Sequence, residues 1–415
     1  MMIPEGYKKT ELGLIPNDWE LISLLSKCEL LNGLTYKPEN IVENGLLVIR
    51  SSNIQNGKLV FLDNVYVNLT VDNKQLIKEN DIIICVRNGS ANLIGKCAKA
   101  YKDYAFTFGA FMAVLRGQNN DFIYQVLQQG KIQKQINKNS AATINQITNG
   151  DFKKIVIPFP TYVNEQYKIA NALSDIDELI SALEQLIEKK KNIKQGIMQE
   201  LLTGKRRLPG FSGEWKYYKL NEIGSLSASG VDKKVQPEEK EVILINYSNV
   251  YHQTIISRKD LNHQVTASDE KIKSCNVKKH DVFLTPTSET PDEIAFSAVV
   301  LNDMPGVVYS YHVVRLRPFE SFNGAYINYA MGTDYFRAQA KMFAEGSGIR
   351  YVITLKKFNN MCLYLPNSLN EQNAIVSIIS DIDKEIEVLE NKLEKTIKIK
   401  SGMMSELLTG KKRLV

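Results

Sequence analysis

Short polar and basic side chains gather in six segments of this sequence, three in each half. The segments are 50–53, 87–90, 134–145, 246–249, 285–288 and 346–351. Their composition and their places after short apolar runs predict loops at strand ends. Lys and Arg side chains bind phosphates, while Asn, Gln, Arg, Ser and Thr match the hydrogen-bonding edges of bases in the major groove. The pattern therefore predicts hydrogen bonding to double-stranded DNA.

The side chains expected to contact DNA are the polar and basic members of these segments. They are Arg50, Ser52, Asn53, Arg87, Asn88, Ser90, Lys138, Ser140, Asn246, Ser248, Asn249, Thr285, Thr287, Ser288, Ser347 and Arg350. Arg50, Arg87 and Arg350 rank first among them. For any single residue the alternative interpretation is a solvated turn, because Asn, Ser and Thr also favour turns for local reasons. Matching polar residues at matching places in both halves favour the DNA interpretation.

The remaining polar residues do not indicate catalysis. The five cysteines form no Cys-x-x-Cys pair, and the four histidines have no metal-ligand spacing to a cysteine or carboxylate. We therefore expect reduced, buried thiols and no bound metal. The Gly-Lys pairs at 204–205 and 410–411 lack the other residues of a phosphate-binding loop. The sequence holds neither an adenine-methyltransferase motif nor a glycine-rich S-adenosylmethionine loop, so no catalytic residue is predicted.

The bulk composition is that of an ordinary globular protein. A length of 415 residues, with 44% hydrophobic and 24% charged side chains, fits two or three domains with cores of their own. No apolar run reaches the ~18–20 residues that span a bilayer, and residues 1–19 lack the apolar region of a secretory signal. A cytoplasmic location without membrane contact is expected. The net charge of +6 favours a polyanionic partner only weakly.

The sequence contains an internal repeat with a period near 200 residues. Residues 200–208 and 406–414 share the pattern Glu-Leu-Leu-Thr-Gly-Lys-x-Arg-Leu at an offset of 206. The only two tryptophans, Trp19 and Trp215, pair at an offset of 196 and are interpreted as core residues. Loop lengths therefore differ inside the globular parts, while the segments after them keep their length. A period this long indicates a duplicated domain and not a solenoid.

Within each repeat, a part of mixed structure precedes a long helix. The β-rich runs are 47–50, 81–86, 110–115, 154–157, 242–245, 281–284, 313–316 and 361–365, with helix expected at 122–137 and 326–343. Residues 164–202 and 370–408 are each predicted to form one proline-free helix, ~58 Å long. The expected caps are Asn164, Asn370, Gly204 and Gly410. Heptad-spaced apolar residues give each helix a face that needs a partner.

The two helices can supply that partner to each other, and the alternative is that each packs only on its own globular domain. The predicted fold class is α+β, with two pseudo-repeated α/β domains joined by two long antiparallel coiled-coil helices. The predicted limits are 1–163 for the first domain, 164–208 for the first helix, 209–369 for the second domain and 370–415 for the second helix.

Antiparallel helices would present the two domains in inverted senses, to half-sites on opposite DNA strands. The helix length limits the separation of those half-sites to ~17 base pairs. Between their shared landmarks the two domains diverge in sequence. An asymmetric bipartite target is therefore expected, and not a palindrome.

The repeated landmarks resemble those of one family. Ile-Val-Ile-Pro-Phe-Pro at 155–160, then Glu165-Gln166, a long helix ending at 199–208, and Gly-Glu-Trp at 213–215 are similar to the specificity subunit of type I restriction-modification systems. The opening segment 12–20 resembles the start of the first target-recognition domain in that family. The resemblance covers essentially the whole chain. A mild departure is Tyr364, which stands where the first repeat has Pro158.

That resemblance implies two target-recognition domains that each read half of a bipartite site, with the helices as a ruler and a docking surface. The implied partners are double-stranded DNA, two methyltransferase subunits and restriction (translocase) subunits. S-adenosylmethionine, ATP and Mg²⁺ are expected on those partners, so this chain binds no cofactor and is not itself an enzyme. The helix residues expected to dock partners are Ile176, Leu183, Ile197, Leu201, Ile382, Leu389, Met403 and Leu407.

Two other functions stay open at this point. A stand-alone DNA-binding regulator would bind its site tightly without a methyltransferase partner. A coiled-coil scaffold would use its domains to bind protein or glycan. A neighbouring gene for a methyltransferase with an Asn-Pro-Pro-aromatic motif would favour the specificity subunit.

Overall fold

The structure, a computed structural model, describes residues 3–139 and 146–415. The chain forms two compact units: unit 1 comprises Met1–Glu184 and Asn391–Val415, and unit 2 comprises Gln185–Glu390. Each unit holds one globular part together with one half of each long helix. The domain limits predicted from the sequence, at residues 163, 208 and 369, separate the globular parts from the long helices. These limits stay a prediction.

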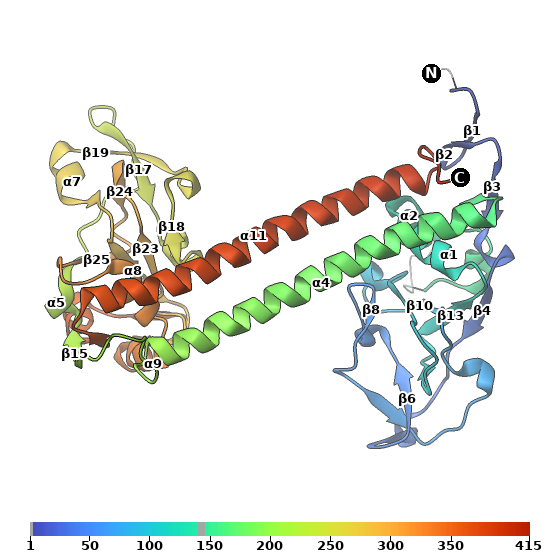
Figure 1. The fold of residues 1–415 in the computed structure, drawn as a ribbon, viewed down its shortest axis with the longest axis horizontal. Coiled ribbons are helices and arrows are strands. Elements are labelled where there is room, and N and C mark those ends of the chain that lie inside the picture. Colours follow the sequence, from blue (N-terminus) through green and yellow to red (C-terminus); the bar gives the residue numbers. More distant parts are fainter. Residues whose placement is uncertain (1–2, 140–145) are drawn as a thin grey trace. The chain divides into compact units, whose positions relative to one another are not determined.

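The two long helices have the same length, and each contributes one segment to unit 1 and one to unit 2. Helix α4 spans Val163–Leu201 and helix α11 spans Leu369–Leu407, each 39 residues long (Figure 1). Both predicted helices are confirmed to within one residue at each end. The predicted N-terminal caps are wrong, because Asn164 and Asn370 lie inside the first turn. At α11 the hydroxyl of Ser368 accepts a hydrogen bond from the Glu371 amide at 3.4 Å.

Both helices end in the predicted way. Gly204 and Gly410 have φ angles of 70° and 68°, in the left-handed region that glycine enters without a steric penalty. The amides of Arg206 and Lys412 then turn back to the carbonyls of Glu200 and Glu406, each at 3.2 Å. The two Gly-Lys pairs therefore terminate helices and do not open a phosphate-binding loop.

The two glycines differ in what surrounds them, and this predicts unequal effects of alanine. A Cβ atom at position 204 would lie 3.4 Å from the Trp215 ring, whereas one at position 410 would lie 2.4 Å from the Pro16 ring. Gly204→Ala is expected to cost about 1–2 kcal/mol for its left-handed backbone. Gly410→Ala should cost more, because Pro16 must also move. Urea unfolding of the two variants measures the difference.

Gly402→Ala serves as the control for this pair. Gly402 lies inside α11, and a Cβ atom at this position would have no other atom within 4 Å. Alanine there should therefore stabilise the chain by about 1 kcal/mol. Equal costs at positions 204 and 410 would contradict the contact between Gly410 and Pro16.

Within each unit the two half-helices run antiparallel. The ion pairs that join the two helices include Asp177–Lys400 in unit 1 and Lys190–Glu385 and Lys194–Asp383 in unit 2. Beyond the helix ends, Arg413 pairs with Glu165 of α4 and Arg207 with Glu371 of α11, and all five N···O distances are 2.5–2.6 Å. In both units residue numbers rise along α4 as they fall along α11. The predicted antiparallel pairing is therefore confirmed in each unit.

The half-helices also pack on the globular parts. Ile169 and Leu173 of α4 lie in the hydrophobic core of unit 1, and Ile375 and Ile379 of α11 lie in the core of unit 2. The apolar face of each helix is thus shared between the other helix and a globular part. Packing on the globular part alone, the alternative interpretation, is wrong.

Unit 1 contains two four-stranded sheets and three strand pairs. Its strands are β1 Tyr7–Thr10, β2 Gly13–Pro16, β3 Trp19–Ser23, β4 Glu29–Asn32, β5 Ile41–Val42, β6 Leu46–Ile49, β7 Ile54–Gln55, β8 Lys58–Leu59, β9 Val65–Val67, β10 Ile82–Cys85, β11 Cys97–Lys99, β12 Thr107–Phe108, β13 Met112–Arg116 and β14 Val156–Pro160. One sheet has the antiparallel order β11-β10-β13-β4, and the other the order β12-β6-β9-β5 with β12 and β6 parallel. Pairs β1-β2, β3-β14 and β7-β8 complete the unit.

Unit 2 repeats this plan. Its strands are β15 Trp215–Lys219, β16 Gly224–Ser227, β17 Lys240–Ile245, β18 Ile255–Ile256, β19 Gln264–Ala267, β20 Asn276–Val277, β21 Val282–Leu284, β22 Thr287–Ser288, β23 Ser297–Val300, β24 Met304–Tyr309, β25 Val314–Pro318, β26 Glu345–Ser347, β27 Arg350–Val352 and β28 Cys362–Pro366. The orders are β16-β25-β21-β23-β18, β19-β17-β24-β20, β22-β27-β26 and β15-β28. All eight predicted strands overlap observed ones.

The short helices correct one prediction. They are α1 Asn120–Leu127, α2 Gly130–Asn139 and α3 Asn149–Phe152 in unit 1, and α5 Leu220–Ile223, α6 Tyr247–His252, α7 Asp269–Ser274, α8 Gly324–Ala330, α9 Asp334–Phe343 and α10 Leu355–Asn360 in unit 2. Each helix predicted at 122–137 and 326–343 is in fact two. In unit 2 the break at 331–333 contains Gly332, a weak helix former.

The same buried ion pair supports the antiparallel sheet of both units. Asp81 accepts two hydrogen bonds from Arg116 at 2.8 and 2.6 Å, and Asp281 accepts two from Arg317 at 2.7 Å. Both carboxylates are buried. The ion pair lies at the opposite end of these strands from the polar loops, since Asp81 precedes β10 and segment 87–90 follows it.

Candidate nucleic-acid interface

In unit 1 two of the predicted polar loops are joined. Segment 50–53 follows β6, and segment 87–90 follows β10. The Nδ2 group of Asn88 donates a hydrogen bond to the hydroxyl of Ser51 at 3.0 Å. The side chains of Ser52, Arg87 and Ser90 are exposed. These two segments, with the turn at 109–112, are called the first loop cluster.

Arg87 lies against an aromatic ring that the sequence reasoning missed. Its guanidinium carbon is 5.1 Å from the centroid of the Phe111 ring, and Phe111 is 53% exposed. A stacked ring holds the guanidinium plane in place while its N–H groups at the edge stay free to donate. The only signal in the sequence was Phe111 itself, an aromatic residue near the start of the strand predicted at 110–115.

The first loop cluster borders a concave surface of about 590 Å³. Tyr36, Arg50, Ser52 and Phe111 are among the residues that line it. Arg50 is not free, since its Nη2 group donates to a carboxylate oxygen of Asp63 at 2.6 Å. Phosphate contact by Arg50 would therefore compete with that ion pair. The combination of two aromatic rings, Tyr36 and Phe111, and one arginine in a concavity suits sugar, base and phosphate surfaces.

Asn53 does not lie at the protein surface, where a side chain that contacts DNA would be expected. It is fully buried, its Oδ1 accepts from the Arg50 amide at 3.0 Å, and its Nδ2 donates to the carbonyl of Val60 at 3.1 Å. Because both ends of the amide are used within the loop, Asn53 shapes the first loop cluster from beneath. The prediction that it contacts DNA is corrected accordingly.

This difference between neighbours predicts opposite outcomes for two alanine variants. Asn53→Ala should lower the free energy of unfolding by about 1–3 kcal/mol, because it leaves buried backbone groups without partners. Ser52→Ala, at an exposed position, should change it by less than about 0.5 kcal/mol. Chemical denaturation of both variants checks the pair. If Asn53→Ala left the free energy of unfolding unchanged, Asn53 would again be a candidate DNA contact.

Unit 2 places the equivalent first segment in the same conformation. The amide of Asn246 donates to Oδ1 of Asn249 at 2.9 Å, which matches the contact between Arg50 and Asn53. Asn246 also bonds its Nδ2 to Nδ1 of His263 at 2.7 Å. Within 246–249 Ser248 is exposed, while the other three residues are half-buried. Ser248 is therefore the best placed of its predicted contacts.

The second predicted segment of unit 2 faces inward. Thr285 is fully buried, and its hydroxyl accepts from the Phe296 amide at 3.0 Å. Ser288 is 9% exposed and bonds the carbonyl of Thr290. Thr287 is half-buried, and its carbonyl accepts from the Tyr247 hydroxyl at 2.8 Å. The predictions for Thr285 and Ser288 are corrected, because their buried hydroxyls bond within the loop. Thr287 stays a predicted contact, because only its backbone is used here.

A β-hairpin presents the third segment of unit 2. Strands β26 and β27 pair with each other, and β27 also pairs with β22. Ser347, Ile349 and Arg350 are exposed at the tip, where Gly348 has a φ of 68°. Arg350 and Ser347, both predicted contacts, therefore lie together on an accessible ribbon of the size that major grooves admit.

The turn before β25 adds residues that the sequence reasoning missed. His312 follows β24 as Phe111 follows β12, and both Tyr311 and His312 are exposed. Partial burial, helped by the charges of Lys233 and Arg350, lowers the pKa of His312 below its usual value. An arginine therefore lies near an aromatic ring in both units. Segment 246–249, the hairpin tip 347–350, Tyr311, His312 and Lys233 are called the second loop cluster.

Two predicted contacts cannot be placed by their side chains. Lys138 belongs to helix α2, whose description near its end is limited to the backbone. Ser140 lies outside the described residues. In the described part of this segment, Gln146 forms a β-bridge with Arg87, at the place where β27 pairs with β22 in unit 2.

The helix residues predicted to dock partners are only partly accessible. Leu183, Leu201 and Leu407 are buried, while Ile176, Ile197, Ile382, Leu389 and Met403 are half-buried. Leu407 and Leu201 belong to the cores of units 1 and 2 respectively. Apolar residues of the two helices that are more exposed include Leu179, Leu186 and Ile193 of α4 and Val388, Ile397 and Ile399 of α11, each 40% exposed or more. A partner would reach these residues first.

Chemistry other than binding has little support in the described residues. Across 3–139 and 146–415, no group of three His, Cys, Asp or Glu side chains is arranged to hold a metal ion. The five cysteines are free, and burial raises the pKa of Cys28 and Cys97 to about 12. Helices long and apolar enough to cross a membrane are likewise absent from these ranges.

Comparison with known proteins identifies the family. The model of the type I restriction modification DNA specificity domain matches residues 16–195 and again 212–398. The specificity subunit of the type I restriction enzyme EcoKI from Escherichia coli K12 is 31% identical over 206 residues, which cover 46% of this chain and 44% of that protein. The chain thus matches less than half the length of that relative. The MjaVIII specificity subunit of Methanocaldococcus jannaschii is 23% identical across 99% of this chain and 96% of its own.

A solved structure shares the fold. The S subunit of a type I restriction-modification system from M. genitalium has a TM-score of 0.61 at 18% identity, and the match covers 98% of both chains. The two family matches fall on the two globular parts and extend into the helices that follow them. This chain therefore belongs to the family of type I restriction-modification DNA specificity domains and carries that domain twice.

Proposed function

We propose that this chain is the DNA-recognition subunit of a type I restriction-modification enzyme. The observation that carries the proposal is the pair of loop clusters, built at equivalent strand ends of two specificity domains. Each cluster exposes an arginine: Arg87 lies 5.1 Å from the Phe111 ring centroid, and the charge of Arg350 helps to lower the pKa of His312. Polar and basic groups on a preformed scaffold are what base and phosphate recognition requires.

The two clusters should read different half-sites. In unit 1 an arginine follows β10 at position 87, whereas the corresponding strand of unit 2 leads into Thr287, and Phe111 is replaced by His312. Hydrogen-bonding groups of different type and reach select different bases. The expected target is thus bipartite and asymmetric, and contact residues are the exposed members of each cluster.

The partners of the complex are proposed as well. Methyltransferase subunits, two in number, would dock on the helices, and restriction subunits would join through them. Leu186 and Ile193, exposed on the unit 2 part of α4, are better placed for docking than the buried leucines. S-adenosylmethionine, ATP and Mg²⁺ would be bound by these partners, and the cytoplasm, where their DNA substrate lies, is the expected location.

Reconstitution with the methyltransferase encoded beside this chain tests the proposal. The purified complex should bind a DNA duplex selected from a random pool, with affinity falling steeply as salt rises. The chain alone should bind that duplex far more weakly. Tight specific binding without the methyltransferase would favour a stand-alone regulator. Failure of both preparations to bind DNA, with the complex intact, would favour a protein-binding scaffold.

A further inference from the structure

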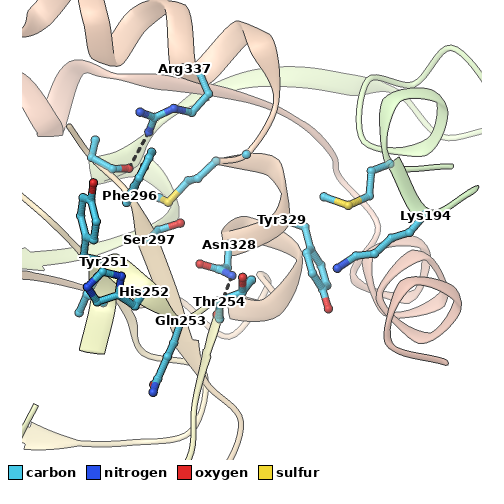
Figure 2. A pocket seen from close by; sticks show the side chains of 15 residues that line it. Lys194, Tyr251, His252, Gln253, Thr254, Phe296, Ser297, Asn328, Tyr329 and Arg337 are labelled. Carbon is cyan, nitrogen blue, oxygen red and sulfur yellow. Dashed lines mark hydrogen bonds between the residues drawn. The ribbon is translucent and has the colours of Figure 1, made fainter. Parts of the chain in front are cut away.

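Unit 2 contains a cavity of about 380 Å³ next to the second loop cluster, whose Tyr247 ring stacks on Tyr251 of the cavity wall with the centroids 5.8 Å apart. Its walls come from the second half of α4, from the end of α6, from β23 and from α8 and α9. Figure 2 shows Tyr251, His252 and Phe296 on one side, Tyr329 and Lys194 on the other, and Asn328 with Thr254 between them. A volume of this order suits a small ligand.

A difference in side-chain size between the two units accounts for this cavity. Helices α1 and α8 occupy equivalent places, since Asn119 and Asn323 at their starts bond Gln166 and Gln372 of the long helices. Counting from these caps, Tyr124 corresponds to Asn328. Tyr124 is buried and donates to the Gly57 carbonyl, while Asn328 donates to the Thr254 carbonyl. A whole aromatic ring in unit 1 is therefore replaced by a short amide in unit 2.

The amide that replaces the ring is left half satisfied. Asn328 is 3% exposed, and its Oδ1 has no hydrogen-bond partner among the described residues. The Oε1 atom of Gln253, which lines the same cavity, is also unpartnered within the described chain. Buried acceptors of this kind are rare because desolvation is costly. The Gln253 amide points away from Asn328 in Figure 2, so Asn328 Oδ1 is the acceptor that calls for a ligand with an N–H donor.

The walls favour a flat and neutral ligand. The rings of Tyr251 and Phe296 lie 5.3 Å apart by their centroids, and Tyr329 forms part of the opposite wall. Cations near the cavity are already engaged: Lys194 pairs with Asp383 at 2.5 Å, and Arg337 donates to the carbonyls of Ala295 and Asp292. Burial raises the pKa of Tyr329 to about 12, so its hydroxyl stays neutral. Little free charge remains for a phosphate.

We propose that this cavity binds a nucleobase that carries an exocyclic amino group. An amino hydrogen would be donated to Asn328 Oδ1, and the ring would lie against the aromatic walls, as bases do on aromatic side chains. The base can come from a free nucleoside or from a nucleotide unstacked from DNA. This site does not depend on the loop clusters, so it can fail while the proposed function stands.

Nucleosides that differ only in the amino group provide the test. Ligand-observed NMR with the full chain should give saturable binding of adenosine. Purine riboside, which lacks the amino group, should bind at least ~10-fold more weakly because it loses the hydrogen bond to a buried acceptor. A duplex with one unpaired adenine that displaces adenosine better than the fully paired duplex would identify DNA as the source. Lack of displacement would identify the free nucleoside.

Two variants and one control connect the binding to this cavity. Asn328→Tyr installs the residue of unit 1 and should abolish binding, while Asn328→Leu, which removes the acceptor at similar size, should weaken it ~10-fold. Thermal unfolding verifies that both variants fold. Tyr124→Phe in unit 1 should leave adenosine binding unchanged. Equal binding of adenosine and purine riboside, absence of saturable binding, or full binding by folded Asn328→Tyr would each overturn the proposal.

Discussion

Arg413→Ala is expected to lower the free energy of unfolding of unit 1 by about 3–5 kcal/mol, because a buried carboxylate loses its cation. Arg413 donates to both carboxylate oxygens of Glu165 at 2.6 and 2.8 Å, and Glu165 is buried. The Trp19 indole donates to the same carboxylate at 3.1 Å. The segment after α11 is thereby fastened to the start of α4. Differential scanning calorimetry and hydrogen exchange in unit 1 measure the loss.

Matched variants separate this ion pair from general effects at the chain end. Lys412→Ala removes an exposed neighbouring charge and should change stability by less than about 0.5 kcal/mol. Arg413→Lys keeps the charge but cannot form the two-pronged contact, so it should fall between the other two variants. If Arg413→Ala and Lys412→Ala behaved alike, the contact with Glu165 would not stabilise the unit.

Lowering the pH should weaken the second ion pair that Arg413 forms, the one with Asp18. Hydrogen bonds from Arg413 hold the pKa of Asp18 below its usual value. A carboxylate with a depressed pKa contributes its stabilisation above the pKa of the unfolded chain, about 3.9, and loses it as pH falls below that. Wild-type unit 1 should therefore lose stability in this range more steeply than Arg413→Ala. Because Asp18 is partly exposed, salt should reduce the difference.

Arg87→Ala is expected to relax one half of the DNA target and leave the other half intact. Loss of one two-pronged base contact reduces discrimination by about 1–3 kcal/mol, or roughly 5–150-fold. Phe111→Ala, which removes the ring beneath the guanidinium, should have a smaller effect on the same half-site. Selection of bound duplexes by the reconstituted complex, followed by sequencing, reads out both halves at once.

Arg350→Ala is the reciprocal variant. It alters the exposed hairpin tip of unit 2 and should relax only the other half-site. Comparable loss of discrimination at both half-sites from either variant would contradict separate recognition by the two loop clusters. A uniform loss of affinity with unchanged sequence preference would reassign the arginine to phosphate binding.

The sequence predicted the periodic parts of this fold well. Helices α4 and α11 were found because a heptad stripe without proline has one interpretation over 39 residues, and their glycine ends follow from the need for a left-handed residue. The N-terminal caps were misplaced by a few residues, because Ser368 and Asn370 are both good cap residues and only the backbone decides between them. The breaks within 122–137 and 326–343 were missed because the apolar spacing continues across them.

The polar loops were harder to interpret. Asn53, Thr285 and Ser288 have the composition of contact residues, yet they are buried and use their hydrogen bonds inside the loop. Sequence does not separate an amide that shapes a loop from one that faces a ligand, since both need the same groups. Phe111, Tyr311 and His312 were missed because their exposure depends on a turn that tertiary packing defines. Segment 346–351 was predicted as a polar loop, and its residues Ser347 and Arg350 are indeed exposed, on a hairpin that the sequence did not reveal.

The most direct test of the central claim is the pattern of adenine methylation in cells. This chain and its neighbouring methyltransferase would be expressed in a host without other adenine methylation, and modified bases would be mapped across the genome. The account predicts one asymmetric bipartite motif, with two specified halves separated by a fixed spacer and one modified adenine on each strand. Arg87→Ala should degenerate one half of that motif. A palindromic motif, or no methylation by an intact complex, would contradict it.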